Sequence, residues 1–232
     1  MNKLFFSVVA LLAFTSCASE YKIEGSSSVS RLDGKMLFVK VPSGDRMLSV
    51  DSAEVVHGMF KMEGITDSIS MASLYMDDES IMPFVIEKGK ISIRIDNTRI
   101  IVSGTPLNDR LYSFVGKKTS LDDRAYELER KESRMIMDGK TQDEIRREMT
   151  KEREKLVTEM NSLAKEFIRQ NYDNVLGPGV FIMLCSNFPY PVITPLIEEI
   201  LTEAPDKFKD NPLVKDYVTT ARSNMEKLKV PH

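Results

Sequence analysis

Apolar and polar residues alternate from Tyr21 to about Gly104, in short runs separated by turn residues. Alternation with a period of two is typical of strands that bury one face. Eight runs at this spacing favour a sandwich or a barrel-like sheet. The runs are YKIEG, KMLFVKV, SAEVV, MFKMEG, SISMASLYM, IMPFVIE, KISIRI and IIVSG. We therefore expect an antiparallel β domain over residues 17–104.

Two turns in this region predict β-hairpins. His57-Gly58 suits a two-residue turn that pairs Val56 with Met59, Val55 with Phe60, Glu54 with Lys61, and Ala53 with Met62. Lys88-Gly89 likewise pairs Glu87 with Lys90, Ile86 with Ile91, Phe84 with Ile93, and Met82 with Ile95. A one-residue slip would mix charged with apolar groups, so the pattern specifies the register. Pro83 favours an edge strand or a bulge.

The hydrophobic period changes after Gly104. Thr105 suits the N-cap of a helix, and Pro106 suits its first position. Apolar residues then recur at spacings of four and three from Leu107 to Met135, which is typical of a heptad stripe. Gly116 and a second cap residue, Ser120, leave open a division into two helices.

A second long helix is expected over residues 141–172, after a turn at residues 138–140. The two would form a long antiparallel hairpin. Shorter helices should follow residues 177–179, beginning at Thr194-Pro195 and Asn211-Pro212. The sequence thus predicts an α+β protein in which an α-helical domain of residues 105–232 follows the β domain.

The N-terminus resembles the signal sequence of a bacterial lipoprotein. Lys3 precedes the apolar run of residues 4–14, which is shorter than the ~20 residues that span a bilayer. Small residues then precede Cys17, as in a lipobox, although Phe14 stands where Leu is usual. The resemblance implies a signal peptide of residues 1–16 and a lipidated Cys17. The alternative is ordinary secretion with cleavage after Ala18.

Two or three acyl chains on Cys17 would be a lasting membrane anchor. Ala18 is not an acidic residue of the kind that retains lipoproteins in the inner membrane, so we expect an outer-membrane lipoprotein facing the periplasm. Exposure on the cell surface stays open.

Neither the composition nor the residue spacing indicates a catalytic, metal-binding or nucleic-acid-binding site. The net charge of -3 provides no basic face for nucleic acid. Cys185 lies in the apolar stretch VFIMLCSNF and is expected to be a buried thiol. The two histidines, His57 and His232, lack the spacing of a zinc site. Residues 77–79 lack the pattern of a calcium loop and favour a solvated turn. We therefore expect no catalytic residues, no cofactor, no metal site and no enzyme activity.

Three segments resemble a known family: DSAEVVHGMFKMEG, PFVIEKGKISIRI and VSGTPLNDRLYSF. They are similar to the hallmark segments of a domain of unknown function that precedes the thioredoxin-like domain of many periplasmic lipoproteins. The matching residues, within roughly residues 20–115, are Asp51-Ser52, Gly58, Phe60, Glu87, Gly89, Gly104-Thr105 and Asn108.

The thioredoxin-like domain that normally follows carries a Cys-x-x-Cys motif, whereas residues 185–188 contain one cysteine. Dithiol exchange needs two sulfurs, so the resemblance implies a location and an accessory role.

These observations favour a non-enzymatic, membrane-anchored envelope lipoprotein that binds an envelope protein. One alternative is an accessory to a thiol–disulfide system whose dithiol partner is a separate chain. Another is a binder of a small ligand or glycan, which the absence of Trp disfavours. The charged outer surface of the helical hairpin is one predicted partner surface, and a merely solvated hairpin is the alternative.

Overall fold

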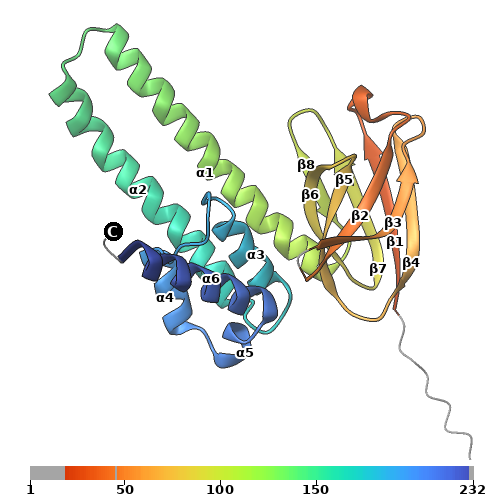
Figure 1. The fold of residues 1–232 in the computed structure, drawn as a ribbon. Helices are drawn as coiled ribbons and strands as arrows, with labels where there is room; N and C mark the ends of the chain where they lie inside the picture. The colour runs from red at the N-terminus through yellow and green to blue at the C-terminus, as the bar shows by residue number, and fades with distance from the viewer. Residues whose placement is uncertain (1–18, 45, 230–232) are drawn as a thin grey trace, which may run out of the picture.

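The computed structural model describes residues 19–44 and 46–229. The predicted signal peptide, Cys17 and His232 lie outside the described residues. Within the described part, eight strands precede six α-helices (Figure 1), which confirms the predicted α+β class. The strands are β1 (Ser19–Ser27), β2 (Met36–Ser43), β3 (Arg46–Glu54), β4 (Met59–Thr66), β5 (Ser70–Met76), β6 (Glu79–Ile86), β7 (Gly89–Ile95) and β8 (Ile100–Ser103).

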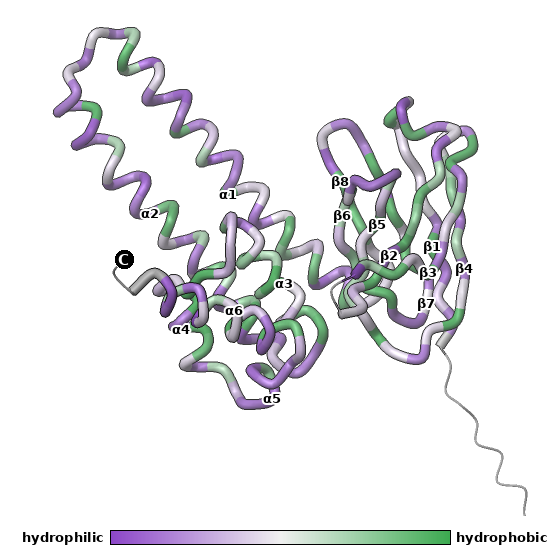
Figure 2. The backbone as a smooth tube through the Cα atoms, viewed as in Figure 1, coloured by the Kyte–Doolittle hydropathy of each residue, from purple (hydrophilic) through white to green (hydrophobic). Residues whose placement is uncertain are grey.

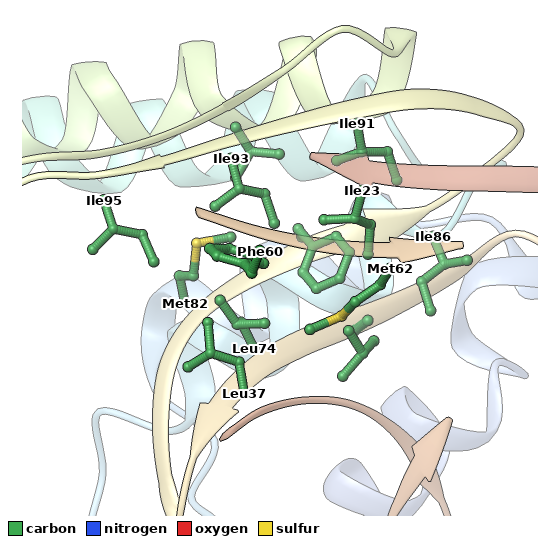
Figure 3. Packing of buried hydrophobic residues seen from close by; sticks show 14 of the residues in the cluster. Ile23, Leu37, Phe60, Met62, Leu74, Met82, Ile86, Ile91, Ile93 and Ile95 are labelled. Carbon is green, nitrogen blue, oxygen red and sulfur yellow. The ribbon is translucent and has the colours of Figure 1, made fainter. Parts of the chain in front are cut away.

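The strands form a sandwich of two sheets, with the orders β4-β1-β7-β8 and β3-β2-β5-β6. Inward-facing side chains of both sheets interlock between them (Figure 3). Ile23, Phe60 and Ile93 come from the first sheet, and Leu37 and Leu74 from the second; each is at most 2% exposed. Burying a side chain of this size contributes ~1.5–3 kcal/mol, which explains why buried and exposed residues alternate along strands such as β4 and β7.

The predicted turn at His57-Gly58 is present. Both residues have positive φ angles, 50° and 71°, as a tight two-residue turn requires. Val56 and Met59 flank the turn and exchange two backbone hydrogen bonds, of 2.9 and 3.0 Å. This single bridge is isolated, and strand pairing stops there.

The other predicted pairings of the first hairpin, and all predicted pairings of the second, are wrong. β3 pairs with β2 and β4 pairs with β1, so Lys61 lies opposite Glu24 instead of Glu54. β6 pairs with β5, while β7 pairs with β1 and β8, so Ile91 lies opposite Ile23. Each turn carries the chain from one sheet to the other. The predicted apolar faces are nevertheless buried. Every second side chain of a strand points into the core, whether its neighbour is paired beside it in a hairpin or faces it across the sandwich.

The position of Pro83 is as predicted, since β6 is an edge strand. The register between β5 and β6 also shifts close to it, between Leu74 and Tyr75. One pairing differs from the expected antiparallel order: β1 and β7 run parallel. The other strand pairs in the described part are antiparallel.

Two long helices follow the sandwich, α1 (Pro106–Met137) and α2 (Gln142–Arg169). α1 is continuous through Gly116, so the division at Ser120 is not observed. Gly139, with φ 74°, turns the chain into α2, which begins with a capping box between Thr141 and Glu144. The predicted antiparallel helical hairpin is therefore confirmed.

The outer part of this hairpin, residues 118–158, projects beyond the rest of the helical domain (Figure 1) and is called the arm below. Figure 2 shows that most residues of the arm are hydrophilic, with hydrophobic ones at intervals. Near its tip the two helices share a small apolar seam of Leu128, Met135, Ile145 and Met149.

The shorter helices form a base around the inner parts of α1 and α2. They are α3 (Leu176–Cys185), α4 (Pro195–Glu203), α5 (Asp206–Lys209) and α6 (Pro212–Lys229). The starts predicted at Thr194-Pro195 and Asn211-Pro212 are confirmed. α3 begins earlier than expected and includes residues 177–179. A Cβ on Gly177 would lie 2.3 Å from the carbonyl oxygen of Asn171, so glycine permits this close packing.

Candidate functional site

Several residues that carry the family resemblance meet where the sandwich joins α1: Glu87, Gly89, Gly104, Thr105 and Asn108. Glu87, directly after β6, is 6% exposed. Its Oε1 accepts hydrogen bonds from the backbone N–H groups of Leu107 (2.9 Å) and Asn108 (3.1 Å). A carboxylate in this position satisfies N–H groups that have no partner within the helix and complements the helix dipole. Thr105 occupies the N-cap position as predicted, but Glu87 supplies the capping oxygen.

Asn108 is the centre of this joint and has no exposed surface. Its Oδ1 accepts from the Val85 N–H at 2.9 Å, and its Nδ2 donates to the Val85 carbonyl at 2.8 Å. Nδ2 also donates to Thr105 Oγ1 at 2.9 Å. The amide thus pairs with edge strand β6 as a neighbouring strand would, and fastens α1 to the sheet.

Two glycines permit the close approach at this joint. Gly89 has φ 120° and Gly104 has φ 101°, values that L side chains rarely adopt. A Cβ on Gly104 would lie 2.5 Å from the Lys90 carbonyl oxygen. The Gly104 N–H donates to Asp109 Oδ1 at 2.9 Å. These hallmark residues therefore position the two domains and do not converge on an open site.

Two other hallmark residues, Asp51 and Phe60, also have structural partners. Asp51 accepts a hydrogen bond of 2.9 Å from the Tyr21 hydroxyl across the sandwich, and this contact adds to burial in raising the pKa of Tyr21. Phe60 packs so closely on Gly25 that an added Cβ there would lie 2.0 Å from its ring.

Comparison with known families identifies the segment that contains the sandwich and the joint. Residues 21–111 match the model of a family described as a domain of unknown function (DUF4369). This segment is a DUF4369 domain. The DUF4369 domain thus contains the sandwich from Tyr21 onwards, together with the joint and the first turn of α1. No curated protein and no solved structure matches the chain.

Near the base, α1 borders one hollow on its helical side and another on the side of the sandwich. One, of about 590 Å³, lies among α1, α2 and α3 and has mainly apolar walls, including Phe114, Leu121, Val157, Met160, Leu163 and Val180. Val157 is 55% exposed. The other, of about 1000 Å³, separates the sandwich from α1 and has mixed walls. Lys118 and Asp122 border both hollows and form an ion pair of 2.7 Å.

The arm above these hollows carries ion pairs between its helices. Lys131 lies 2.8 Å from both Glu148 and Glu152, and Arg124 pairs with Glu159. These hydrogen bonds, first that to Glu148, raise the pKa of Lys131. Exposed pairs of this kind contribute about 0–1 kcal/mol each, so they align the helices more than they stabilise them.

Cys185 is buried at the end of α3, with 3% exposure, as predicted. Burial raises its pKa to about 12, although a hydrogen bond with Tyr217 acts in the opposite direction. The nucleophilic form of cysteine is the thiolate. Cys185 therefore has little nucleophilic form near neutral pH in the folded protein.

The other candidates lie apart from one another. Asp77 and Asp78 form an exposed turn between β5 and β6, and His57 lies in its own turn. Across residues 19–44 and 46–229, no cluster of three or more His, Cys, Asp or Glu side chains is arranged to hold a metal ion. No helix in this part is long and apolar enough to cross a membrane.

The contact between Glu87 and Asn108 was not predicted: Glu87 was expected opposite Lys90 in a hairpin, and Asn108 stood out only through the family resemblance. The available signal was a polar residue that interrupts an apolar pattern: Glu87 follows the run Phe84–Ile86, and Asn108 follows Leu107. No short stretch of the sequence could have predicted the apolar hollow, because its walls come from three helices.

Proposed function

We propose that this protein is a non-enzymatic envelope lipoprotein, anchored to the outer membrane through Cys17, that binds a protein partner where the arm meets the base. The observation that carries the binding role is the apolar hollow among α1, α2 and α3. Concave apolar surfaces of this kind are typical of binding sites. The lipobox-like sequence before Cys17 supports the anchor.

An accessory role in a thiol–disulfide system is the alternative from another class. Since Cys185 is buried and its pKa is raised, this role would depend entirely on thiols of a separate chain. A glycan-binding role has little support, because the hollow contains one aromatic side chain, Phe114.

The anchor is tested by metabolic labelling with a fatty-acid analogue in the bacterium that makes the protein. Wild-type protein should carry the label and fractionate with the outer membrane, and Cys17→Ala should do neither. Equal labelling of both forms, or a soluble wild-type protein, would rule out the anchor.

The binding surface is tested by cross-linking in intact envelopes followed by mass spectrometry. Val157→Glu places a charge in the hollow, whereas Ile136→Glu places one on the arm outside it, at almost the same exposure (55% and 56%). Cross-linked partners should be lost with Val157→Glu and retained with Ile136→Glu. Retention of every partner with both variants contradicts the proposal.

Deletion tests the arm as a whole. Replacing residues 118–158 by a short flexible linker removes one wall of the hollow and leaves the joint intact. Partners should disappear while the melting temperature of the DUF4369 domain stays unchanged. If partners persist, the exposed face of the sandwich becomes the candidate surface.

A further inference from the structure

We infer that the end of the sandwich at which β1 begins rests directly on the lipid surface. This inference depends on the anchor proposed above and extends it to named side chains. We call this end the proximal end and the opposite one, which contains the 57–58 and 96–99 turns, the distal end. Strand directions place the start of β1, the β2–β3 turn and the β4–β5 turn at the proximal end (Figure 1). The β6–β7 turn and the joint with α1 also lie at this end, beside the start of β7.

The length of chain between the anchor and the fold carries the inference. β1 begins at Ser19, two residues after Cys17. Two residues span at most about 7 Å, since an extended chain advances ~3.3–3.6 Å per residue. The acyl chains of a lipidated Cys17 enter the bilayer at that residue, so the start of β1 lies within about 7 Å of the membrane.

Exposed apolar side chains lie at this end. Ile65 is 68% exposed and follows Gly64, and its backbone partner in β1 is Glu20, next to Ser19. Ile69, in the β4–β5 turn, is 50% exposed. Leu48, near the start of β3 in the facing sheet, is 55% exposed. Facing sheets lie ~10 Å apart, so exposed apolar groups of both sheets lie near this end.

The charged side chains at the proximal end carry both signs. Lys22 pairs with Glu63 at 3.2 Å, and Glu20, Arg46 and Asp67 are exposed. Attraction to an anionic surface is therefore not the driving force. The contact should rely on apolar burial beside the anchor and should form on a zwitterionic membrane at high salt.

Exposure alone does not distinguish the two ends. Val56 and Met59 at the distal end are 53% and 50% exposed. The attachment point distinguishes them, because strands of seven to nine residues place the distal end about 25 Å from the anchor at ~3.3 Å per residue. The distal residues provide a matched control.

The test uses the lipidated chain, purified from its bacterium and reconstituted into phosphatidylcholine vesicles that contain a nitroxide-labelled lipid. A small fluorophore is attached at Ser68→Cys, in the β4–β5 turn, or at Asn97→Cys, in the β7–β8 turn. Lipidation blocks the sulfur of Cys17, and burial protects Cys185. The label at position 68 should lose most of its fluorescence, and the label at position 97 should keep it.

A second pair of variants tests the side chains themselves. In the Ser68→Cys protein, Ile65→Ser with Ile69→Ser should reduce quenching, whereas Val56→Ser with Met59→Ser should leave it unchanged. Equal quenching at positions 68 and 97, or no quenching at 68 in a chain whose acyl groups are confirmed by mass spectrometry, overturns the membrane contact and leaves the anchor intact. If mass spectrometry finds no acyl groups on the purified chain, both the proposed anchor and the membrane contact are ruled out.

Discussion

At the residue scale, the side chain of Asn108 makes the hydrogen bonds that a neighbouring strand would otherwise make to the edge of a sheet. Its amide satisfies both backbone groups of Val85, at the edge of a sheet that would otherwise end there. Buried backbone groups need such partners, because each one left unpaired costs about 1–3 kcal/mol. The same contact links the DUF4369 domain to the helices, so one residue contributes both to stability and to domain position.

Asn108→Ala should therefore lower the free energy of unfolding by about 3 kcal/mol, since each buried group left without a partner costs about 1–3 kcal/mol. Urea unfolding followed by circular dichroism measures the loss. Asn161→Ala, at an exposed position in α2, is the matched control and should change stability by less than about 0.5 kcal/mol. Equal effects of the two substitutions would show that the joint contributes little.

Cys185 leads to a second prediction. Its thiol should react slowly with a disulfide reagent in the native protein and quickly in denaturant, because burial raises its pKa to about 12. A raised pKa means that the folded state holds the proton more tightly than the unfolded state. Stability should therefore fall as pH rises from about 9 towards 12, and Cys185→Ala should reduce that slope. Rapid modification of the native protein at pH 8 would contradict the buried position.

At the element scale, two helical glycines have opposite roles. Gly116 lies in α1 with no atom within 4 Å of an added Cβ, whereas Gly177 in α3 lies against the Asn171 carbonyl. Glycine inside a helix costs about 0.5–1 kcal/mol relative to alanine.

Gly116→Ala should therefore raise stability by about 0.5–1 kcal/mol. Gly177→Ala should lower it by about 1–3 kcal/mol, as overpacking does. Thermal unfolding of both variants provides the comparison, and a loss of stability with Gly116→Ala would contradict the open surroundings of that residue.

The strands and helices were largely predictable, whereas the strand partners were not. The alternation of apolar and polar residues shows that Phe60 and Ile91 face the core, because the side of a strand on which a residue lies follows from its immediate neighbours in the sequence. It does not show whether Phe60 pairs with β3 or faces it across the sandwich, because both arrangements bury the same side chains. Likewise Thr105 indicates a helix start, but the oxygen that caps the Leu107 N–H belongs to Glu87, 20 positions before Leu107 in the sequence.

At the scale of the whole molecule, three apolar clusters have different sizes. The sandwich and the base each have an extensive core, whereas the arm has a seam of only four residues: Leu128, Met135, Ile145 and Met149. Regions with few buried apolar contacts open most readily. The outer part of the arm should therefore open more readily than the base to which it is attached.

Native-state hydrogen exchange should show this difference. Amides of residues 128–150 should exchange faster than those of β7 and of α2 near Phe167. Met149→Ala should accelerate exchange in the arm, because Met149 is fully buried in the seam, and should leave the sandwich unchanged. Uniform protection along α1 and α2 would contradict the prediction.

The parallel pairing of β1 with β7 determines the order in which the sandwich can assemble. β1 lies between β4 and β7, and Tyr21 meets its parallel partner Gly89 only after about 70 further residues have been made. Non-local pairings of this kind fold slowly, because a long loop must close before the contacts form. A chain that emerges N-terminus first therefore holds its first strand with one edge open until β7 arrives. The domain closes late and as a unit, and a fragment that ends before β7 exposes β1 to pairing with other chains.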